Sequence, residues 1–338
     1  MRWGFIGASS IAERVIGSMR KIPDQEFVAV CSGSAARAKE FAAAQQLQSA
    51  HTDLAELLKA GRLDAVYVSS TNEQHCAQTI AALDAGCHVM CEKPLAMVHA
   101  DAVRMVRHAA AKGRVLGTNH HLRAQAAHAL MRDFIASGEL GELHGVQVSH
   151  AVHLPPHLQG WRLDKPGAGG GVVLDILVHN ADLLRYLLQR EPQRIHTVTQ
   201  RNGMGGRDKA ALAVEDGAMS VIEFEGGALA QTHESFVADA SALTRLHVLG
   251  TRGNLYALGS LTQAGTAQLW LRDARGEREI PVPPVDLYEV GFTAFVNACA
   301  GRGQPLATGA DGTRSMAVAL AGLASAASGR MESIDLSI

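Results

Sequence analysis

The sequence predicts an α/β protein in two parts: an N-terminal doubly wound parallel sheet, then an α+β domain with an open, largely antiparallel sheet. Up to residue 118, short apolar runs alternate with helical stretches, as in a parallel sheet covered on both faces. From residue 143 onward, most strand-like runs follow one another with short turns. A chain of 338 residues is long enough for two domains, which we expect at 1–118 and 119–338.

The first part contains five expected strands separated by alanine-rich helices. Near-continuous apolar runs are typical of strands that are buried on both faces. We expect strands at Trp3–Ile6, Phe27–Cys31, Ala65–Ser69, His88–Cys91 and Val115–Thr118, and helices at Ser34–Gln46, Thr52–Ala60, His75–Ala85 and Ala100–Ala111. Because strand–helix–strand crossovers are right-handed, this order of elements predicts a doubly wound sheet.

The second part begins with a helix and continues as a run of strands. A helix at Ala124–Ser137 precedes a strand at Leu143–Val152, which leads into a loop at Pro155-Pro156. Three glycines, Gly169–Gly171, precede a helix at Val172–Leu188. The remaining expected elements are strands at Arg194–Gln200, Ala218–Phe224, Ala228–Ser235, Thr244–Leu249, Asn254–Leu258 and Gln268–Leu271, and closing helices at Leu287–Ala300 and Thr313–Ser328.

Composition narrows the class of protein. Hydrophobic residues make up 47% of the chain and charged residues 19%, which is ordinary for a folded globular protein. A net charge of −2 provides no basic field to attract nucleic acid or an anionic membrane. The five cysteines form no Cys-x-x-Cys pair, and no apolar stretch reaches membrane-spanning length. We therefore expect a cytoplasmic protein that binds neither nucleic acid nor membranes.

The first expected strand runs into Gly7-Ala8-Ser9-Ser10-Ile11-Ala12, which opens a helix. This segment resembles the Gly-x-Gly-x-x-Gly fingerprint of a Rossmann dinucleotide site, with serine and alanine at its second and third glycine positions. The first glycine permits the tight turn, and the helix N-terminus meets the pyrophosphate. A plain strand–turn–helix is the competing interpretation, but the position at the start of the alternating array favours a cofactor site.

The end of the second expected strand predicts which cofactor binds. An acid there would hydrogen-bond the ribose 2′-hydroxyl of NAD, but this chain has Ser32 and Gly33, followed by Arg37. A hydroxyl and a guanidinium suit a 2′-phosphate. Arg37 as a solvated helix residue is the alternative. The simultaneous absence of an acid favours NADPH over NADH.

Two separated motifs carry groups suited to carbonyl reduction. Lys93 follows the fourth strand at the carboxyl edge of the sheet, where ligands bind in this architecture, and Pro94 is a candidate for a cis peptide bond. Asp175 and His179 are four residues apart on an expected helix and share a face. A lysine ammonium can stabilise negative charge on a carbonyl oxygen, an imidazole can supply the proton, and Asp175 can orient that imidazole. Surface positions are the alternative for all three residues.

The 16 histidines raise the possibility of a metal site. His150, His153 and His157 are close in sequence, but Pro155-Pro156 prevents them from sharing one helix face. No spacing of cysteines and histidines resembles that of a zinc site. We predict that the protein holds no metal.

Together, Glu92-Lys93-Pro94 and Gly169-Gly170-Gly171…Asp175-x-x-x-His179 resemble the two signatures of the glucose–fructose oxidoreductase/inositol dehydrogenase/rhizopine-catabolism (Gfo/Idh/MocA) family. The resemblance covers essentially the whole chain and implies an open antiparallel sheet in the second domain. Segments 65–73, 117–123 and 154–163 resemble members that use NADPH to reduce 1,5-anhydro-D-fructose to 1,5-anhydro-D-mannitol. Asn180 replaces an acid that is common in relatives.

The resemblance implies a set of site residues. Lys93, Asp175 and His179 would be catalytic, and they would meet at one nicotinamide ring. Besides Gly7, Ala8, Ser32, Gly33 and Arg37, the residues implied to line the cofactor are Ser9, Ser10, Ile11, Ser70, Thr71, Asn72, Glu73, Gln74, His75, Glu92, Lys93, Asn119, Trp161, Arg162 and Tyr288. Tyr288 rests on the shortest match.

Two other functions compete with the reduction of a small keto-sugar. One is a dehydrogenase of another polyol such as an inositol, but an acid at the end of the second strand, its mark, is missing. The other is a non-catalytic NADP-binding sugar sensor, which the presence of Lys93, Asp175 and His179 disfavours. The apolar face of an open sheet can serve as a homo-oligomer interface, and the sequence leaves this open.

Overall fold

The computed structural model describes residues 1–338 except 60–61, 165, 205–207, 209–211 and 240. The chain forms two compact units. The first contains Met1–His120, Tyr288–Thr313 and Ser337–Ile338, and the second contains His121–Leu287 and Arg314–Leu336. A single boundary near residue 118 therefore does not describe the chain, because Tyr288–Thr313 belongs with the N-terminal residues.

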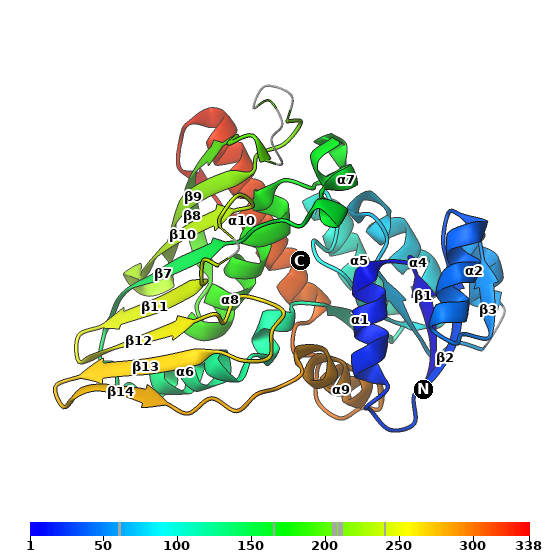
Figure 1. Cartoon of the computed structure of the whole chain (residues 1–338), viewed down its shortest axis with the longest axis horizontal. Coiled ribbons are helices and arrows are strands. Elements are labelled where there is room, and N and C mark those ends of the chain that lie inside the picture. Colours follow the sequence, from blue (N-terminus) through cyan, green and yellow to red (C-terminus); the bar gives the residue numbers. More distant parts are fainter. Residues whose placement is uncertain (60–61, 165, 205–207, 209–211, 240) are drawn as a thin grey trace. The chain divides into compact units, whose positions relative to one another are not determined.

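The first unit is built on a parallel sheet of six strands, in the order β3-β2-β1-β4-β5-β6. This order confirms the doubly wound sheet. Three of the strands, β1, β2 and β3, are labelled in Figure 1. The strands are β1 (Arg2–Ile6), β2 (Glu26–Cys31), β3 (Ser49–His51), β4 (Ala65–Val68), β5 (His88–Cys91) and β6 (Leu116–Thr118). The helices are α1 (Ser10–Met19), α2 (Ala35–Ala44), α3 (Leu54–Lys59), α4 (His75–Asp84) and α5 (His99–Ala111). The sequence did not predict β3, which is too short to form an apolar run.

Aromatic packing explains why a late segment returns to the first unit. Helix α9 (Leu287–Cys299) contributes Phe292 and Phe295, whose ring centroids lie 5.8 and 5.7 Å from that of Trp3. The ring of Phe292 also meets Tyr67 edge to face at 5.4 Å. All four side chains are fully buried. Since burying one such ring stabilises a fold by roughly 1.5–3 kcal/mol, α9 is an integral part of this unit.

The second unit contains a sheet of nine strands, in the order β14-β13-β12-β11-β7-β10-β9-β8-β15. β7 and β10 pair in parallel, and the other neighbours pair antiparallel, which confirms the expected, largely antiparallel sheet. The strands are β7 (Leu143–Ala151), β8 (Pro192–Gln200), β9 (Gly217–Phe224), β10 (Leu229–Ser235), β11 (Arg245–Gly250), β12 (Gly253–Leu258), β13 (Gln268–Asp273), β14 (Gly276–Ile280) and β15 (Glu332–Ser333). The edge strands β14 and β15 were not predicted, because they are short and mostly polar.

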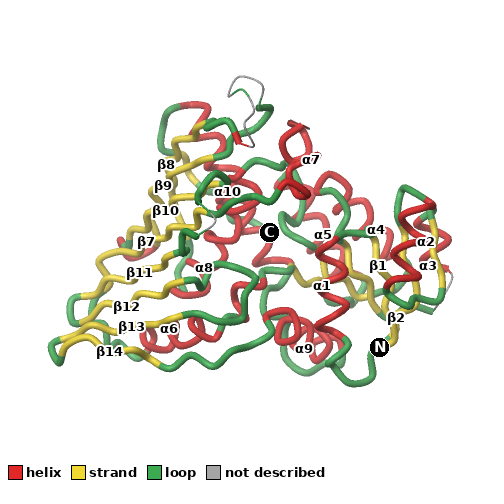
Figure 2. The backbone as a smooth tube through the Cα atoms, viewed as in Figure 1, coloured by secondary structure: helices red, strands yellow, loops and turns green. Residues whose placement is uncertain are grey.

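Helices cover one face of this sheet. Figure 2 shows α6 (Ala126–Ala136), α8 (Val178–Leu188) and the second-unit part of α10 (Gly309–Ser328) on the same side of the strands. Gly322 of α10 packs closely, since a Cβ there would lie 3.1 Å from Thr197 of β8. On the opposite face, Val198 and Met219 are exposed. The sheet is therefore open on one side.

The segment around Pro155-Pro156 differs from the expected loop. Residues Pro156–Asp164 form helix α7, with a non-helical Gly160 inside it. Proline is well suited to the first helical position, because no intrahelical partner is lost there. Within the described residues, no helix combines the length and apolar character needed to cross a membrane.

Candidate active site

The turn between β1 and α1 has the backbone that a dinucleotide site requires. Gly7 has φ +111°, and a Cβ there would lie 2.7–2.8 Å from backbone atoms of Ser69 and Ser70. Its N–H donates to the carbonyl of Cys31 at 2.9 Å. Glycine is therefore needed at this position both for its conformation and for the close approach of the β4 end. The turn lies at the carboxyl edge of the sheet, at the N-terminus of α1.

Ser9 occupies the position where the fingerprint has its second glycine. It is the N-cap of α1, with φ −113°, and its Oγ accepts from the N–H of Ala12 at 3.2 Å. The hydroxyl donates to Ser69 Oγ at 2.9 Å, and that hydroxyl lies 3.3 Å from the carbonyl of Gly7. Ser9 thus fastens the turn, and its backbone conformation does not require glycine. Ser69 was missing from the expected residues.

Arg37 reaches the same turn from α2. Ser34 caps that helix by accepting from the N–H of Arg37 at 3.4 Å. The Nη2 of Arg37 donates to the carbonyl of Ala8 at 2.9 Å, and the side chain is exposed. The guanidinium is therefore beside the Gly7–Ser9 turn and remains accessible to an anion. Ser32 and Gly33 lie between β2 and α2, as expected.

A cluster of Tyr67, Glu92 and Asn119 joins the ends of three neighbouring strands. The Tyr67 hydroxyl and the Asn119 amide both donate to Glu92 Oε1, the amide at 2.5 Å. Burial, and then the negative charge of Glu92, raise the pKa of Tyr67 well above its ordinary value. Tyr67 therefore remains a donor. The sequence did not single it out, because an aromatic residue in an apolar run looks like ordinary core.

The imidazole of His75 holds the loop that carries Lys93. Lys93 follows Glu92, and the Lys93–Pro94 peptide bond is cis. The ring of His75 lies 2.9 Å (Nδ1) from the Pro94 carbonyl and 3.2 Å (Nε2) from the Ser70 carbonyl. Burial lowers the pKa of His75, although both contacts to carbonyls oppose that shift. His75 thus ties the Lys93 loop to the segment after β4.

The other expected cofactor residues of the first unit are also placed. Asn72–Gln74 form a short 3₁₀ turn after Thr71, between the end of β4 and α4. Ser10 and Ile11 begin α1. Tyr288 is buried in the aromatic core with Phe292, at 3% exposure, and its contact with a cofactor stays a prediction.

In the second unit, Asp175 and His179 lie on either side of a change in helix type. Residues Val173–Leu177 form a π-helical turn, and α8 continues as α-helix from Val178. The sequence predicted one regular helix, since a widened turn leaves no clear trace in apolar spacing. Single π turns of this kind often occur at functional sites.

Both residues have close neighbours within the second unit. The Oδ2 of Asp175 lies 3.5 Å from the Nε of Arg162, which comes from α7. The imidazole of His179, at 7% exposure, meets that of His121 edge to face at 4.9 Å. His121 was not among the expected site residues. The side chain of Trp161 lies outside the described part of the chain. The orientation of His179 by Asp175 stays a prediction.

Two glycines of the Gly169–Gly171 triplet are required by close packing within the second unit. In the structure, a Cβ at Gly170 would collide with the backbone of Arg162, and one at Gly171 with the carboxylate of Glu215. The Oε1 of Glu215 also accepts from the N–H of Val173 at 3.1 Å. Contacts within the protein therefore account for these two glycines.

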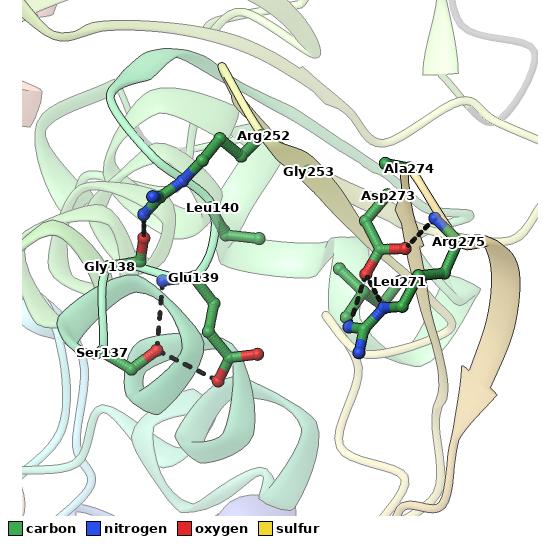
Figure 3. Close-up of a pocket in the computed structure, with 10 residues that line it drawn as sticks. All are labelled: Ser137, Gly138, Glu139, Leu140, Arg252, Gly253, Leu271, Asp273, Ala274 and Arg275. Carbon is green, nitrogen blue, oxygen red and sulfur yellow. Dashed lines mark hydrogen bonds and ion pairs between the residues drawn. The ribbon is translucent and has the colours of Figure 1, made fainter.

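In the described part of the chain, neither a metal-binding cluster nor the pocket in the second unit brings together the expected site residues. Among the described residues, His, Cys, Asp and Glu do not gather in threes as a metal site would require. Figure 3 shows a pocket of about 420 Å³ in the second unit, lined by Ser137, Gly138, Glu139, Leu140, Arg252, Gly253, Leu271, Asp273, Ala274 and Arg275. Hydrogen bonds from Arg275, and then from Arg278, hold the pKa of Asp273 well below its usual range. None of the expected site residues lines this pocket.

Comparisons with known proteins identify a family for each part of the chain. Residues 1–120 match the family described as "Oxidoreductase family, NAD-binding Rossmann fold", and residues 128–256 match the "GFO/IDH/MocA C-terminal domain". The chain is 47% identical to 1,5-anhydro-D-fructose reductase of Ensifer adhaerens, over 99% of this chain and 98% of the relative. It is 33% identical to D-glucoside 3-dehydrogenase of Escherichia coli (strain K12), over 70% of each chain.

A solved structure confirms the fold over nearly the whole length. The aldose-aldose oxidoreductase of Caulobacter crescentus, crystallised with glycerol, matches with a TM-score of 0.88 and 22% identity over 99% of each chain. The two matched domains and the end-to-end similarity to a relative show that the chain belongs to the Gfo/Idh/MocA family of oxidoreductases.

Proposed function

We propose that this protein uses NADPH to reduce the keto group of a cyclic sugar, converting 1,5-anhydro-D-fructose to 1,5-anhydro-D-mannitol. The observation that carries the proposal is the 47% identity, over 99% of the chain, to a protein named 1,5-anhydro-D-fructose reductase. The relative at 33% identity, a D-glucoside 3-dehydrogenase, is matched over only 70% of this chain.

The first unit fits the cofactor. The Gly7–Ser9 turn places the N-terminus of α1 at the carboxyl edge of the sheet, where a pyrophosphate binds. The exposed guanidinium of Arg37 beside Ala8, and Ser32 in place of an acid, suit the 2′-phosphate of NADPH. Glu92 and Asn119 would then lie on the ribose and nicotinamide side of the site, as the family resemblance implies, and Tyr67 would support Glu92 there.

NADPH, when bound, supplies the hydride. As the carbonyl carbon accepts it, negative charge develops on oxygen, and the Lys93 ammonium stabilises that charge. The His179 imidazolium gives its proton to the same oxygen, a contribution of typically 10²–10⁴-fold in rate. Asp175 orients this imidazole and favours its charged form. Arg162, whose Nε lies 3.5 Å from the Asp175 Oδ2, helps to hold that carboxylate in place.

A panel of keto-sugars, with NADPH and NADH side by side, tests the proposal. We expect the fastest loss of NADPH absorbance with 1,5-anhydro-D-fructose, and much slower turnover with NADH. Faster oxidation of an inositol by NADP⁺ would instead identify a polyol dehydrogenase. Tight NADPH binding without turnover of any sugar would identify a sensor.

A further inference from the structure

A buried polar bridge joins the helix that carries His179 to the sheet of the second unit. Asn180 of α8 lies between His150 of β7 and Glu234 of β10, which are direct neighbours in the parallel β7–β10 pair. The His150 Nδ1 lies 2.8 Å from the Asn180 Oδ1, and the Asn180 Nδ2 donates to the Glu234 Oε1 at 2.8 Å. His150 is 6% exposed, and Asn180 and Glu234 are fully buried.

The carboxamide of Asn180 is suited to this position because it donates on one side and accepts on the other. Either neighbour left without a partner would destabilise the buried site. Burial raises the pKa of Glu234 to about 7, so this carboxyl is reluctant to ionise. Apolar side chains could fill this buried space without any hydrogen bonds. The bridge therefore contributes mainly by fixing the orientation of α8 relative to the sheet of the second unit.

The bridge fixes the rotation of α8 about its own axis. Asn180 follows His179 directly, so the direction of the Asn180 side chain determines where the neighbouring side chain along the helix points. The imidazole of His179 in turn packs against His121. A rotated helix would break both hydrogen bonds of Asn180 and move the His179 ring.

We propose that Asn180 is a positioning residue, and that the His150–Asn180–Glu234 bridge holds the His179 imidazole in the orientation needed for proton donation. This inference rests on the proposed function, in which His179 is the proton donor. A misplacement of about 1 Å in a reacting group can lower a rate by roughly a hundredfold, so a small rotation of α8 suffices to affect turnover.

The Asn180→Asp variant tests the bridge with minimal change in shape. The variant removes the Asn180 hydrogen bond that lowers the pKa of Glu234 and places a second carboxyl group beside it, so one proton shared between the two groups can preserve the contact near neutral pH. At higher pH, two adjacent carboxylates repel. His128 of α6 also acts on His150, but its pKa is lowered to about 4, so it stays neutral in this range. We expect kcat relative to wild type to fall about tenfold or more between about pH 6 and about pH 9, with an unchanged KM for NADPH.

A second substitution should reverse this loss. In Asn180→Asp/Glu234→Gln, the new amide donates to the new carboxylate, so the bridge exists at both pH values. We expect kcat to return to within about threefold of wild type. Asn254→Asp makes the same chemical change on β12, outside the bridge, and should leave kcat and its pH profile unchanged. A pH-independent kcat ratio for Asn180→Asp, or no recovery in the double variant, would overturn the proposal.

Imidazole NMR of the same proteins keeps the two hypotheses separate. The His179 resonance, assigned with His179→Gln, should shift in Asn180→Asp at about pH 9 and return in the double variant. Wild type that turns over no keto-sugar contradicts the proposed function, whereas the NMR shift tests the bridge regardless. A His179 resonance that is identical in wild type and Asn180→Asp at both pH values would contradict the bridge.

Discussion

At the level of single residues, Ser9 shows why a departure from a motif need not abolish its function. The serine caps α1 and bonds to Ser69, so its side chain stabilises the turn that glycine would merely permit. The sequence predicted the turn from Gly7 onward. It could not predict Ser69 as the partner, because that contact depends on the alignment of β1 with β4 rather than on local spacing.

The Arg37 guanidinium is the side chain on which the cofactor prediction depends most. Replacing Arg37 with alanine removes a charge-assisted contact worth about 1.5–3 kcal/mol, so the Kd for NADPH should rise about tenfold or more. The Kd for NADH should change little, since NADH lacks the 2′-phosphate. Calorimetric titration of both cofactors measures this difference. An unchanged Kd for NADPH would remove Arg37 from the cofactor site.

The imidazole of His179 is the proposed proton donor. His179→Ala should lower kcat by roughly a hundredfold or more while leaving the Kd for NADPH unchanged, because the cofactor turn lies in the other unit. Single-turnover kinetics with the keto-sugar would measure the effect. His144→Ala, at an exposed position of β7, is the matched control. Wild-type turnover in His179→Ala would exclude this role.

The residues that sequence reasoning missed most often are polar or aromatic side chains that contact an expected site residue or its neighbour. Glu234 occupies an inward position of β10, on the same face as Ala230 and Thr232, so the period of two contained a signal. Tyr67 and His121 carried no such signal. Their roles depend on contacts with Glu92 and His179, which are distant in sequence.

At the level of elements, regular periodicity predicted most helices and strands to within one or two residues. The differences have physical causes. Helix α7 was missed because Pro155-Pro156 indicated a loop, although proline also begins helices. The π turn at Val173–Leu177 was missed because its i→i+5 hydrogen bonds are invisible in the sequence.

The β1–α1 turn gives a direct test of its required geometry. Gly7→Ala should weaken NADPH binding and destabilise the protein by a few kcal/mol, because the left-handed conformation alone costs about 1–2 kcal/mol and the Cβ would press on Ser69. Thermal unfolding and cofactor titration measure both effects. Gly17→Ala in α1, where no atom lies within 4 Å of a Cβ, should be neutral or stabilising. Equal behaviour of the two variants would contradict this account of the turn.

Helix α6 carries a buried histidine that links stability to pH. Burial, and then the charge of His150, lower the pKa of His128 from 6.5 to about 4, and its Nδ1 lies 2.8 Å from the Leu122 carbonyl. Because the folded value is the lower one, its contribution is complete above pH 6.5 and is lost as pH falls towards 4. At about 1.4 kcal/mol per pKa unit, the loss is on the order of 3 kcal/mol.

His128→Asn should remove this dependence, since its amide can still donate to Leu122 without titrating. Urea unfolding at a series of pH values would show a flatter curve for the variant between about pH 6.5 and pH 4. Parallel curves for wild type and variant would indicate that His128 is not buried in a neutral state.

At the level of the whole molecule, the sequence predicted both sheets but assigned α9 to the second domain, whereas nearly all of it belongs to the first unit. An amphipathic helix indicates that one face is buried, without naming its partner. The structure shows that Phe292 and Phe295 pack on Trp3 near the N-terminus. The proposed chemistry likewise needs both units, because Lys93 belongs to the first and His179 to the second.

The central claim is that the chain moves a hydride from NADPH to the keto carbon of a cyclic sugar. Incubation with 1,5-anhydro-D-fructose and NADPH deuterated at nicotinamide C4, followed by mass spectrometry and NMR of the sugar, tests it most directly. We predict 1,5-anhydro-D-mannitol with deuterium at the former keto carbon, in step with NADPH consumed. Unlabelled sugar and unconsumed NADPH, despite tight cofactor binding, would contradict the claim.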